Sequence, residues 1–260
     1  MAIWNKNEQE YLANNKTLFE SFMLADKDGS IINSFGIASN IPIANGDVDG
    51  YAAIHKFGRN PNVGNAPETV WMHGGKYQYL AVDSPSTVYA YSANSEDSAS
   101  GDGARTVSIL GLDNDFNEIE ETVTVGGAAS TKTFLRIYRA FVATAGSTNT
   151  NEGNVLISTG AGGTGTVLAD IGTIGTGTTF GLGQTQLALY TIPAGKTGYL
   201  TTWNVGCAPM NNKATVLLKS RELDGDAPFR TKDIVDLVGG YHTQNYSIPL
   251  KFRLFNFFYI

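Results

Sequence analysis

The chain has 260 residues with a net charge of −6, and 42% of its residues are hydrophobic, a normal value for a globular protein. This length allows one large all-β domain or two small ones, with a core that needs no metal or disulfide. The acidic balance, without any run of lysines and arginines, argues against nucleic acid as a partner. Only 16% of the residues are charged, and 30 glycines favour turns and strands over long helices. A surface so poor in charge suits burial against other subunits, although an ordinary secreted β-sandwich has a similar composition.

The single cysteine, Cys207, excludes an internal disulfide. It lies in an apolar, strand-like run, so we expect a small buried side chain. The N-terminus has no basic segment leading into an apolar stretch, and no apolar run of about 18 residues occurs, so we expect neither a signal peptide nor a membrane span. These features predict a protein made in a cytoplasm, without a membrane partner.

Residues 1–50 differ from the rest and are predicted to form an N-terminal arm with a short helix and an extended segment. Residues 8–23 contain no glycine, and their apolar residues follow an imperfect helical spacing. Such an arm would order against neighbouring subunits, with Leu18, Phe19 and Phe22 as candidate interface residues.

Residues 31–80 show little periodicity but contain several aromatic residues, among them Trp71, Tyr77 and Tyr79. We expect an irregular segment that is held in place by packing and not by regular secondary structure.

From residue 86 onward, apolar and polar residues alternate in short segments at intervals of about ten residues, with turn signals between them. The expected strands cover residues 87–91, 106–110, 119–125, 134–142, 154–158, 187–192, 197–205, 214–220 and 246–252. This pattern predicts an all-β fold, an antiparallel β-sandwich or jelly roll over residues 51–260. A Gly/Thr-rich stretch at residues 160–183 is expected to form either a flexible loop or short strands around a long excursion. Arg136 and Arg139 point to opposite faces if their strand is regular. Either could pair with carboxylates of a neighbouring subunit, but the preferred interpretation is that they face solvent.

The end of the chain, residues 252–260, is unusually rich in aromatic side chains, including Phe255, Phe257, Phe258 and Tyr259. Left exposed, such a run would be a liability in water. We therefore expect it to be a core strand or to contact another subunit, and these aromatic residues are candidate interface residues.

One acidic cluster invites a comparison with calcium-binding loops. Asn45, Asp47 and Asp49 match the first, third and fifth positions of an EF-hand loop, and Gly50 matches the sixth. The bidentate glutamate expected at the twelfth position is Lys56 instead, and no flanking helices are predicted. A simple turn is therefore the preferred interpretation, and no metal site is expected.

Other patterns give no indication of catalysis. Residues 160–165 match a dinucleotide-type glycine pattern, but no helix follows to receive a phosphate. Glu120 and Glu121 would point to opposite faces of a strand, so they cannot flank one substrate bond. The three histidines show no metal or catalytic spacing. We expect a protein without catalytic residues or cofactor.

Several segments, taken in order, carry a family resemblance. They are residues 53–61, 103–107, 111–113, 117–123, 134–139 and 190–197. Each is a generic β motif alone, but their succession resembles a family of virion structural proteins of tailed phages. The resemblance implies a virion component, made in the host cytoplasm, without catalytic residues.

Within the particle, the resemblance favours a capsid cement or decoration protein that contacts the major capsid protein or other virion proteins. A head-fibre or tail-associated protein that binds a receptor or glycan through exposed aromatics is the alternative. We expect a homo-oligomer, with a trimer favoured by analogy with other β-rich phage accessory proteins. The position on the particle and the copy number stay open.

Overall fold

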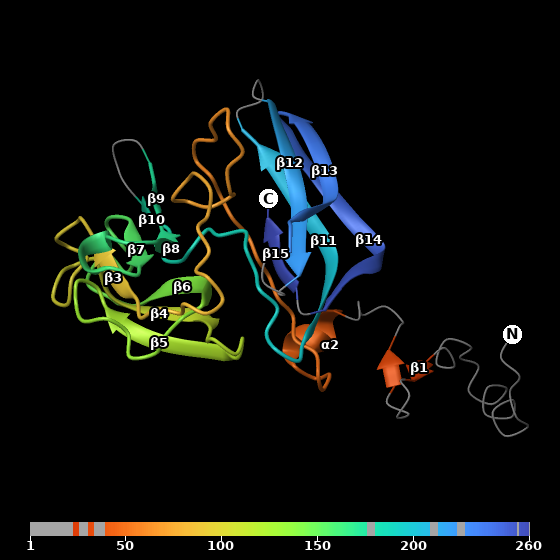
Figure 1. The fold of residues 1–260 in the computed structure, drawn as a ribbon, viewed down its shortest axis with the longest axis horizontal. Helices are drawn as coiled ribbons and strands as arrows, with labels where there is room; N and C mark the ends of the chain where they lie inside the picture. Colours follow the sequence, from red (N-terminus) through yellow and green to blue (C-terminus); the bar gives the residue numbers. More distant parts are fainter. Residues whose placement is uncertain are drawn as a thin grey trace, which may run out of the picture. The chain divides into compact units, whose positions relative to one another are not determined.

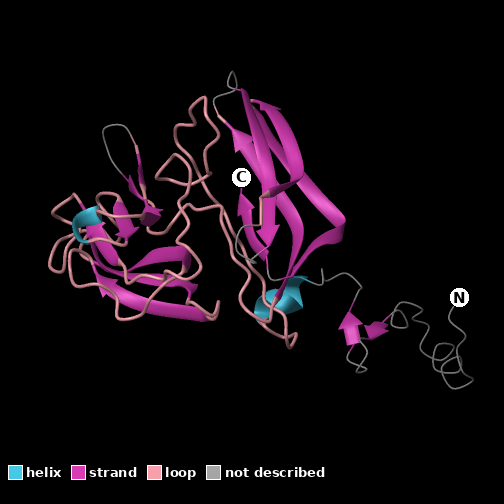
Figure 2. Ribbon diagram, in the orientation of Figure 1, coloured by secondary structure: helices cyan, strands magenta, loops and turns pink. Residues whose placement is uncertain are grey.

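The structure is a computed structural model that describes residues 23–25, 31–33, 40–175, 180–208, 213–222, 227–253 and 255–259. The chain divides into two compact units, residues 1–55 and residues 56–260, whose elements Figure 1 labels. Strands account for 46% of the structure and helices for 4%, and Figure 2 shows this predominance of strands in magenta. The all-β antiparallel fold predicted from the sequence is confirmed.

The first unit contains a short hairpin of β1 (Met23–Ala25) and β2 (Ile31–Asn33) and the helix α2 (Asn40–Asn45). Pro42 lies in the first turn of α2, where its missing N–H has no partner to lose. Of the residues 8–23 that the sequence assigns to an arm or helix, only Met23 is described, and it begins β1. The interface candidates Leu18, Phe19 and Phe22 lie outside the described residues.

In the second unit, two three-stranded sheets pack on one core, and we call them the first sandwich. One sheet has the order β5 (Glu118–Thr124), β4 (Ala104–Leu112) and β6 (Arg136–Ala145). The other has the order β3 (Tyr89–Ser92), β7 (Val155–Ser158) and β8 (Val167–Ile171). Their inward side chains form one cluster of buried apolar residues, contributed by all six strands and by the loops around Trp71 and Leu187.

The hairpin between β4 and β5 follows from its sequence. The Asp113 side chain accepts hydrogen bonds from the backbone N–H groups of Asp115 and Asn117, which closes the turn. Gly111 lies where the pairing of β4 and β6 shifts register, and a Cβ there would come within 2.1 Å of the Arg136 carbonyl oxygen. Glycine is therefore required at this bulge.

The Gly/Thr-rich stretch contains short elements around an excursion. They are η2 (Ala161–Gly163), β8, and a small antiparallel pair of β9 (Thr173–Ile174) and β10 (Phe180–Gly181). This arrangement agrees with the second of the two alternatives that the sequence left open.

The remaining strands form what we call the C-terminal sandwich. Here β11 (Thr197–Cys207) pairs with β14 (Gly240–Arg253), and β12 (Lys213–Glu222) lies between β13 (Arg230–Val238) and β15 (Phe255–Tyr259) (Figure 1). The two sheets enclose a smaller core made of Trp203, Val205, Leu218 and Leu237. Cys207 is half-buried at the margin of this core. A third cluster, of Tyr190, Ile192 and Phe252, packs against side chains of both sandwiches.

Two segments differ from the prediction. Residues 187–192 form no regular strand but an extended, buried segment, in which Leu187 makes an isolated bridge with Trp71. A short apolar run does not distinguish a buried strand from a buried segment without regular pairing, because both place all of their side chains away from water. The aromatic end, treated above as one strand, instead divides between the end of β14 and β15. The sheet orders do not establish the predicted jelly-roll connection.

Candidate interaction surface

The C-terminal sandwich exposes large apolar side chains. Tyr199 on β11, Ile234 and Val238 on β13, and Tyr241 on β14 are 52%, 57%, 69% and 80% exposed. By contrast, none of the exposed large hydrophobic side chains in the described part of the chain lies on the strands β3 to β8 of the first sandwich. Clustered apolar exposure on a folded protein marks an interaction site more often than isolated exposure does.

The regular part of the ladder between β13 and β12, residues 233–238, defines an outer face. Ile234, Asp236 and Val238 share this face because side chains alternate along a strand, and all three are exposed. The opposite face holds Leu237, which is buried in the core. The outer face of this part of β13 therefore combines two apolar side chains with one carboxylate.

The register with β12 extends this surface. Leu217 on β12 pairs with Ile234, and Thr215 pairs with Asp236, whose Oδ1 atom accepts the Thr215 hydroxyl at 2.6 Å. Past the end of β13, Gly239 and Gly240 both have positive φ angles, 65° and 72°, which allow the chain to turn tightly into β14. Tyr241 follows that turn, so its Cα atom lies within about 11 Å of that of Val238.

One carboxylate, that of Asp233, joins the two sheets of the C-terminal sandwich. Its Oδ2 atom accepts hydrogen bonds from the Tyr246 hydroxyl at 2.8 Å and from Trp203 Nε1 at 3.3 Å. Its Oδ1 atom accepts the backbone N–H of Ile234 at 2.8 Å. The hydrogen bond from Tyr246 is the largest cause that holds the pKa of Asp233 below its usual value, and Ile234 and Trp203 lower it further. Asp233 is therefore ionised at neutral pH and fixed between β11, β13 and β14.

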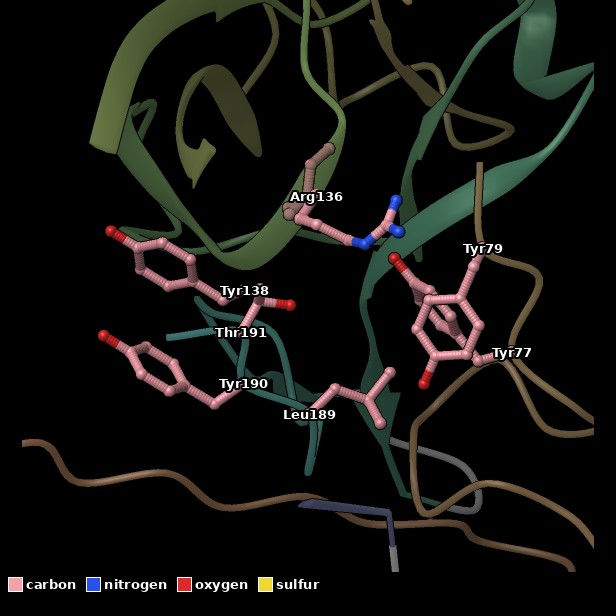
Figure 3. A pocket seen from close by; sticks show the side chains of 8 residues that line it. Tyr77, Tyr79, Arg136, Tyr138, Leu189, Tyr190 and Thr191 are labelled. Atoms are coloured by element: carbon pink, nitrogen blue, oxygen red, sulfur yellow. The ribbon is translucent and has the colours of Figure 1, made fainter. Parts of the chain in front are cut away.

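A small pocket lies elsewhere in the second unit, and Figure 3 shows its lining. Half of the residues that line it are tyrosines: Tyr77, Tyr79, Arg136, Ile137, Tyr138, Leu189, Tyr190 and Thr191. The Arg136 side chain points toward the two tyrosines of the loop before β3, Tyr77 and Tyr79 (Figure 3).

Arg136 does not face solvent, so the prediction for this residue is wrong. It is 3% exposed and donates hydrogen bonds from Nη1 to the carbonyl oxygens of Leu80 and Leu135, at 2.9 and 2.8 Å. Its guanidinium also lies 5.6 Å from the centre of the Tyr79 ring. Burial lowers the pKa of Arg136 to about 10, which still leaves it charged at neutral pH. Alternation along the strand could not reveal a neighbouring loop that covers this residue.

The aromatic residues around the pocket form a packed column. The ring centres of Trp71, Tyr77, Tyr79 and Phe229 follow one another at 5.0, 4.8 and 6.0 Å. Arg221 on β12 lies over both Tyr79 and Phe229, at 4.9 and 4.8 Å from the ring centres. Trp71 and Tyr77 are 3% and 6% exposed, so they offer no open ring for a sugar to stack on. We interpret the column as a structural contact between the first sandwich and β12.

The residues of the calcium comparison lie in a turn at the end of α2. Asn45, Asp47 and Asp49 are exposed, and the N–H groups of Gly46 and Asp47 donate to carbonyl oxygens of α2. Lys56 belongs to the second unit, where its ammonium group donates to the Tyr138 carbonyl oxygen. Burial lowers the pKa of Lys56 to about 7, and the charge of Arg139 contributes. Among the described residues, no group of His, Cys, Asp and Glu side chains could hold a metal ion.

The aromatic interface candidates Phe255, Phe257, Phe258 and Tyr259 lie in or beside the pairing of β15 with β12, and their side chains are outside the described set. Phe252, which begins the same aromatic run, is 4% exposed and packs within its own chain. The exposed residues of β13 were missed because no strand was predicted there. The only available signal was the spacing of Lys232, Ile234, Asp236 and Val238 at every second position.

No helix in the described part of the chain is long and apolar enough to cross a membrane. Comparisons with protein-family models, with curated proteins and with solved structures found no match for this chain.

Proposed function

We propose that this protein is a structural component of a tailed-phage virion, a capsid cement or decoration protein that acts through protein–protein contacts. The observation that carries the proposal is the exposed apolar surface of the C-terminal sandwich, made by Ile234 and Val238 with Tyr241 close to them. The sequence resemblance supplies the virion setting.

The architecture supports this role. The first sandwich has its own core of buried apolar residues. The C-terminal sandwich has a smaller core and leaves apolar side chains outside it. Specific interfaces bury on the order of 1,000 Å² or more, and a chain of this size on a repeating lattice has surface enough for several such contacts.

The test is the protein content of gradient-purified particles of the phage that encodes this chain. We expect mass spectrometry to detect the chain in particles after free lysate proteins are removed, and a density map of the particle to contain it at the capsid surface. If the chain remains entirely in the soluble fraction, the virion role is wrong.

A second candidate function is a head-fibre or tail-associated protein that binds a receptor or glycan. The exposed rings of Tyr199 and Tyr241 favour it, and Lys251 Nζ lies 5.9 Å from the centre of the Tyr199 ring. Binding on a glycan array that is lost in a Tyr199→Ala/Tyr241→Ala variant would support this function over cement. A cement protein should bind no glycan on the same array.

A further inference from the structure

We propose that the outer face of the ladder between β11 and β14 binds a neutral oligosaccharide, one sugar ring of which stacks on Tyr241. This inference rests on the second candidate function, glycan binding, and it specifies the site and the class of ligand. Three observations carry it: the exposure of Tyr241 opposite a glycine, the hydrogen-bonding side chains that continue from it along the ladder, and the lack of charge on all of these side chains.

The ladder is regular where the site lies. Residues 202–207 of β11 pair with residues 240–245 of β14 without a shift, and the register shift of this strand pair lies outside these residues. Side chains alternate along a strand, and Trp203 and Val205 point into the core, at 5% and 7% exposure. The residues between them therefore share the outer face with their register partners. This face consists of Thr202, Asn204 and Gly206 on β11 and of Asn245, Thr243 and Tyr241 on β14, all exposed.

Tyr241 presents an open aromatic ring. It is 80% exposed and lies directly opposite Gly206. Side chains directly across an antiparallel pair normally contact each other, but glycine has none, so nothing on β11 opposite Tyr241 covers its ring. The apolar C–H face of a sugar ring can pack on such an aromatic side chain. Tyr199, also exposed on these strands, lies beyond the register shift and has Lys251 Nζ at 5.9 Å from its ring centre.

Hydrogen-bonding groups continue from Tyr241 along the same face. The Thr202 hydroxyl donates to Asn245 Oδ1 at 2.9 Å, which holds the Asn245 amide and leaves its Nδ2 group to donate. Among the described residues, the Asn204 amide and the Thr243 hydroxyl have no hydrogen-bond partner. Amides and hydroxyls both donate and accept, as sugar hydroxyls do. From Tyr241 to Asn245 the face extends for about 13 Å, the length of a short oligosaccharide.

The charge of this face selects the class of glycan. None of its six residues is charged, and the whole chain has a net charge of −6. An acidic glycan would find no cation on this face and would be repelled by the net charge. A neutral glycan needs no ion pair, because its hydroxyls bond to amides and hydroxyls. The outer face of β13, where Asp236 accompanies Ile234 and Val238, differs in this respect and carries the protein contact proposed above.

A glycan array tests the class of ligand. The full chain, biotinylated at its N-terminus and displayed on streptavidin, is applied to neutral and acidic glycans. Multivalent display compensates for a single-site dissociation constant on the order of 1 mM, which we expect at a face open to water. We expect binding to neutral glycans and none to acidic ones.

Substitution of the two exposed tyrosines tests the site. Tyr241→Ala should raise the dissociation constant of the bound glycan by about tenfold or more in an NMR titration, because it removes the stacking surface. Tyr241→Phe keeps the ring and should bind nearly as the wild type does. Tyr199→Ala is the matched control on the same pair of strands and should leave binding unchanged.

Gly206→Val tests the open ring without removing it. A Cβ atom at Gly206 would lie 3.4 Å from Tyr241 Cβ and 3.5 Å from the Gly240 carbonyl oxygen, which are ordinary contacts, and valine favours strands. The variant should therefore fold with an unchanged thermal midpoint. Its valine side chain would pack on the Tyr241 ring, so we expect a loss of binding similar to that of Tyr241→Ala.

The outcomes separate this inference from the function on which it rests. Binding to acidic glycans alone, or wild-type binding by Tyr241→Ala or by a folded Gly206→Val, would overturn the proposed site. Loss of binding in Tyr199→Ala instead would overturn the site and leave the glycan-binding function in place. Binding of the wild type to no glycan would refute both, and it would not affect the test of the virion role.

Discussion

The first sandwich and the C-terminal sandwich each contain a carboxylate that joins separate segments, and the two carboxylates are used differently. Asp97 in the first sandwich is 3% exposed and accepts the Ser92 hydroxyl and the backbone N–H groups of Ala104, Glu152 and Gly153, at 2.7 to 2.8 Å. All of these donors belong to loops and strand ends of its own fold. Asp233 instead holds one N–H of an open strand edge.

The apolar residues differ in the same way. Ile109 and Phe134 are fully buried in the first sandwich. Ile234 and Val238, of similar chemistry, stand outside the core of the C-terminal sandwich. The strands β3 to β8 of the first region therefore keep their large apolar side chains in the core, while the second region exposes such side chains on its strands. We therefore propose that the first sandwich supplies stability and the C-terminal sandwich supplies contacts.

The sharpest way to break this comparison is to truncate one isoleucine in each region. Ile109→Ala should lower the free energy of unfolding by about 2–5 kcal/mol, because it removes a fully buried side chain and leaves a cavity. Ile234→Ala should change it by less than about 0.5 kcal/mol in the monomer. Chemical denaturation of both variants, at concentrations where self-association is absent, measures the difference. Equal losses would mean that Ile234 is a core residue and not a contact residue.

Substitution of Asp233 tests how much its hydrogen bonds contribute to the stability of the C-terminal sandwich. Asp233→Ala should cost about 1–3 kcal/mol, because it leaves the Trp203 indole N–H and the Tyr246 hydroxyl without their acceptor. Asp236→Ala is the control on the same strand and should cost less, since Asp236 is exposed and contacts one hydroxyl.

The pH dependence follows from the lowered pKa of Asp233. A carboxyl group with a depressed pKa in the folded state contributes stability above its unfolded pKa, about 4, and this contribution is lost as the pH falls through the folded value. The stability difference between wild type and Asp233→Asn should therefore be constant near neutral pH and shrink below about pH 4. A difference that grows on acidification would contradict the hydrogen-bond assignment.

The smallest expected effect concerns the contact between the two regions. Arg221→Leu removes a guanidinium that lies over both Tyr79 and Phe229, an interaction worth about 0.5–2 kcal/mol. We expect the thermal midpoint to fall by about 2–4 °C per kcal/mol lost for a chain of this length. Arg230→Leu, an exposed residue at the start of β13, should leave the midpoint nearly unchanged. A larger fall of the thermal midpoint for Arg230→Leu than for Arg221→Leu would contradict a stabilising role for Arg221.

The extent to which the sequence predicted these regions also differs. The hairpin of β4 and β5 could be predicted because alternating residues flank a polar turn around Asp113. β13 could not, because its outer face mixes charges with Ile234 and Val238 and so does not show a simple apolar alternation. The burial of Arg136 was likewise hidden, since it depends on Leu80 and Tyr79, which are distant in the sequence.

The sequence predicted that an interface exists, but not which residues form it. The low charge content predicted burial against other subunits. The sequence, however, assigned the interface to the aromatic run of residues 252–260 and not to β13. Phe252, in that run, packs against Tyr190 and Ile192 of the same chain. Hydrophobicity along a sequence shows which side chains avoid water, whereas exposure in the fold shows which of them remain for a partner.

Hydrogen exchange followed by mass spectrometry tests most directly whether the C-terminal sandwich is the region of contact. The chain would be compared at a dilute concentration and at a higher concentration at which light scattering shows self-association. We predict slower exchange in the associated state for peptides covering residues 230–238, and equal exchange in both states for peptides covering β4, residues 104–112. Protection on association in β4, or equal exchange of residues 230–238 in the two states, would contradict the account.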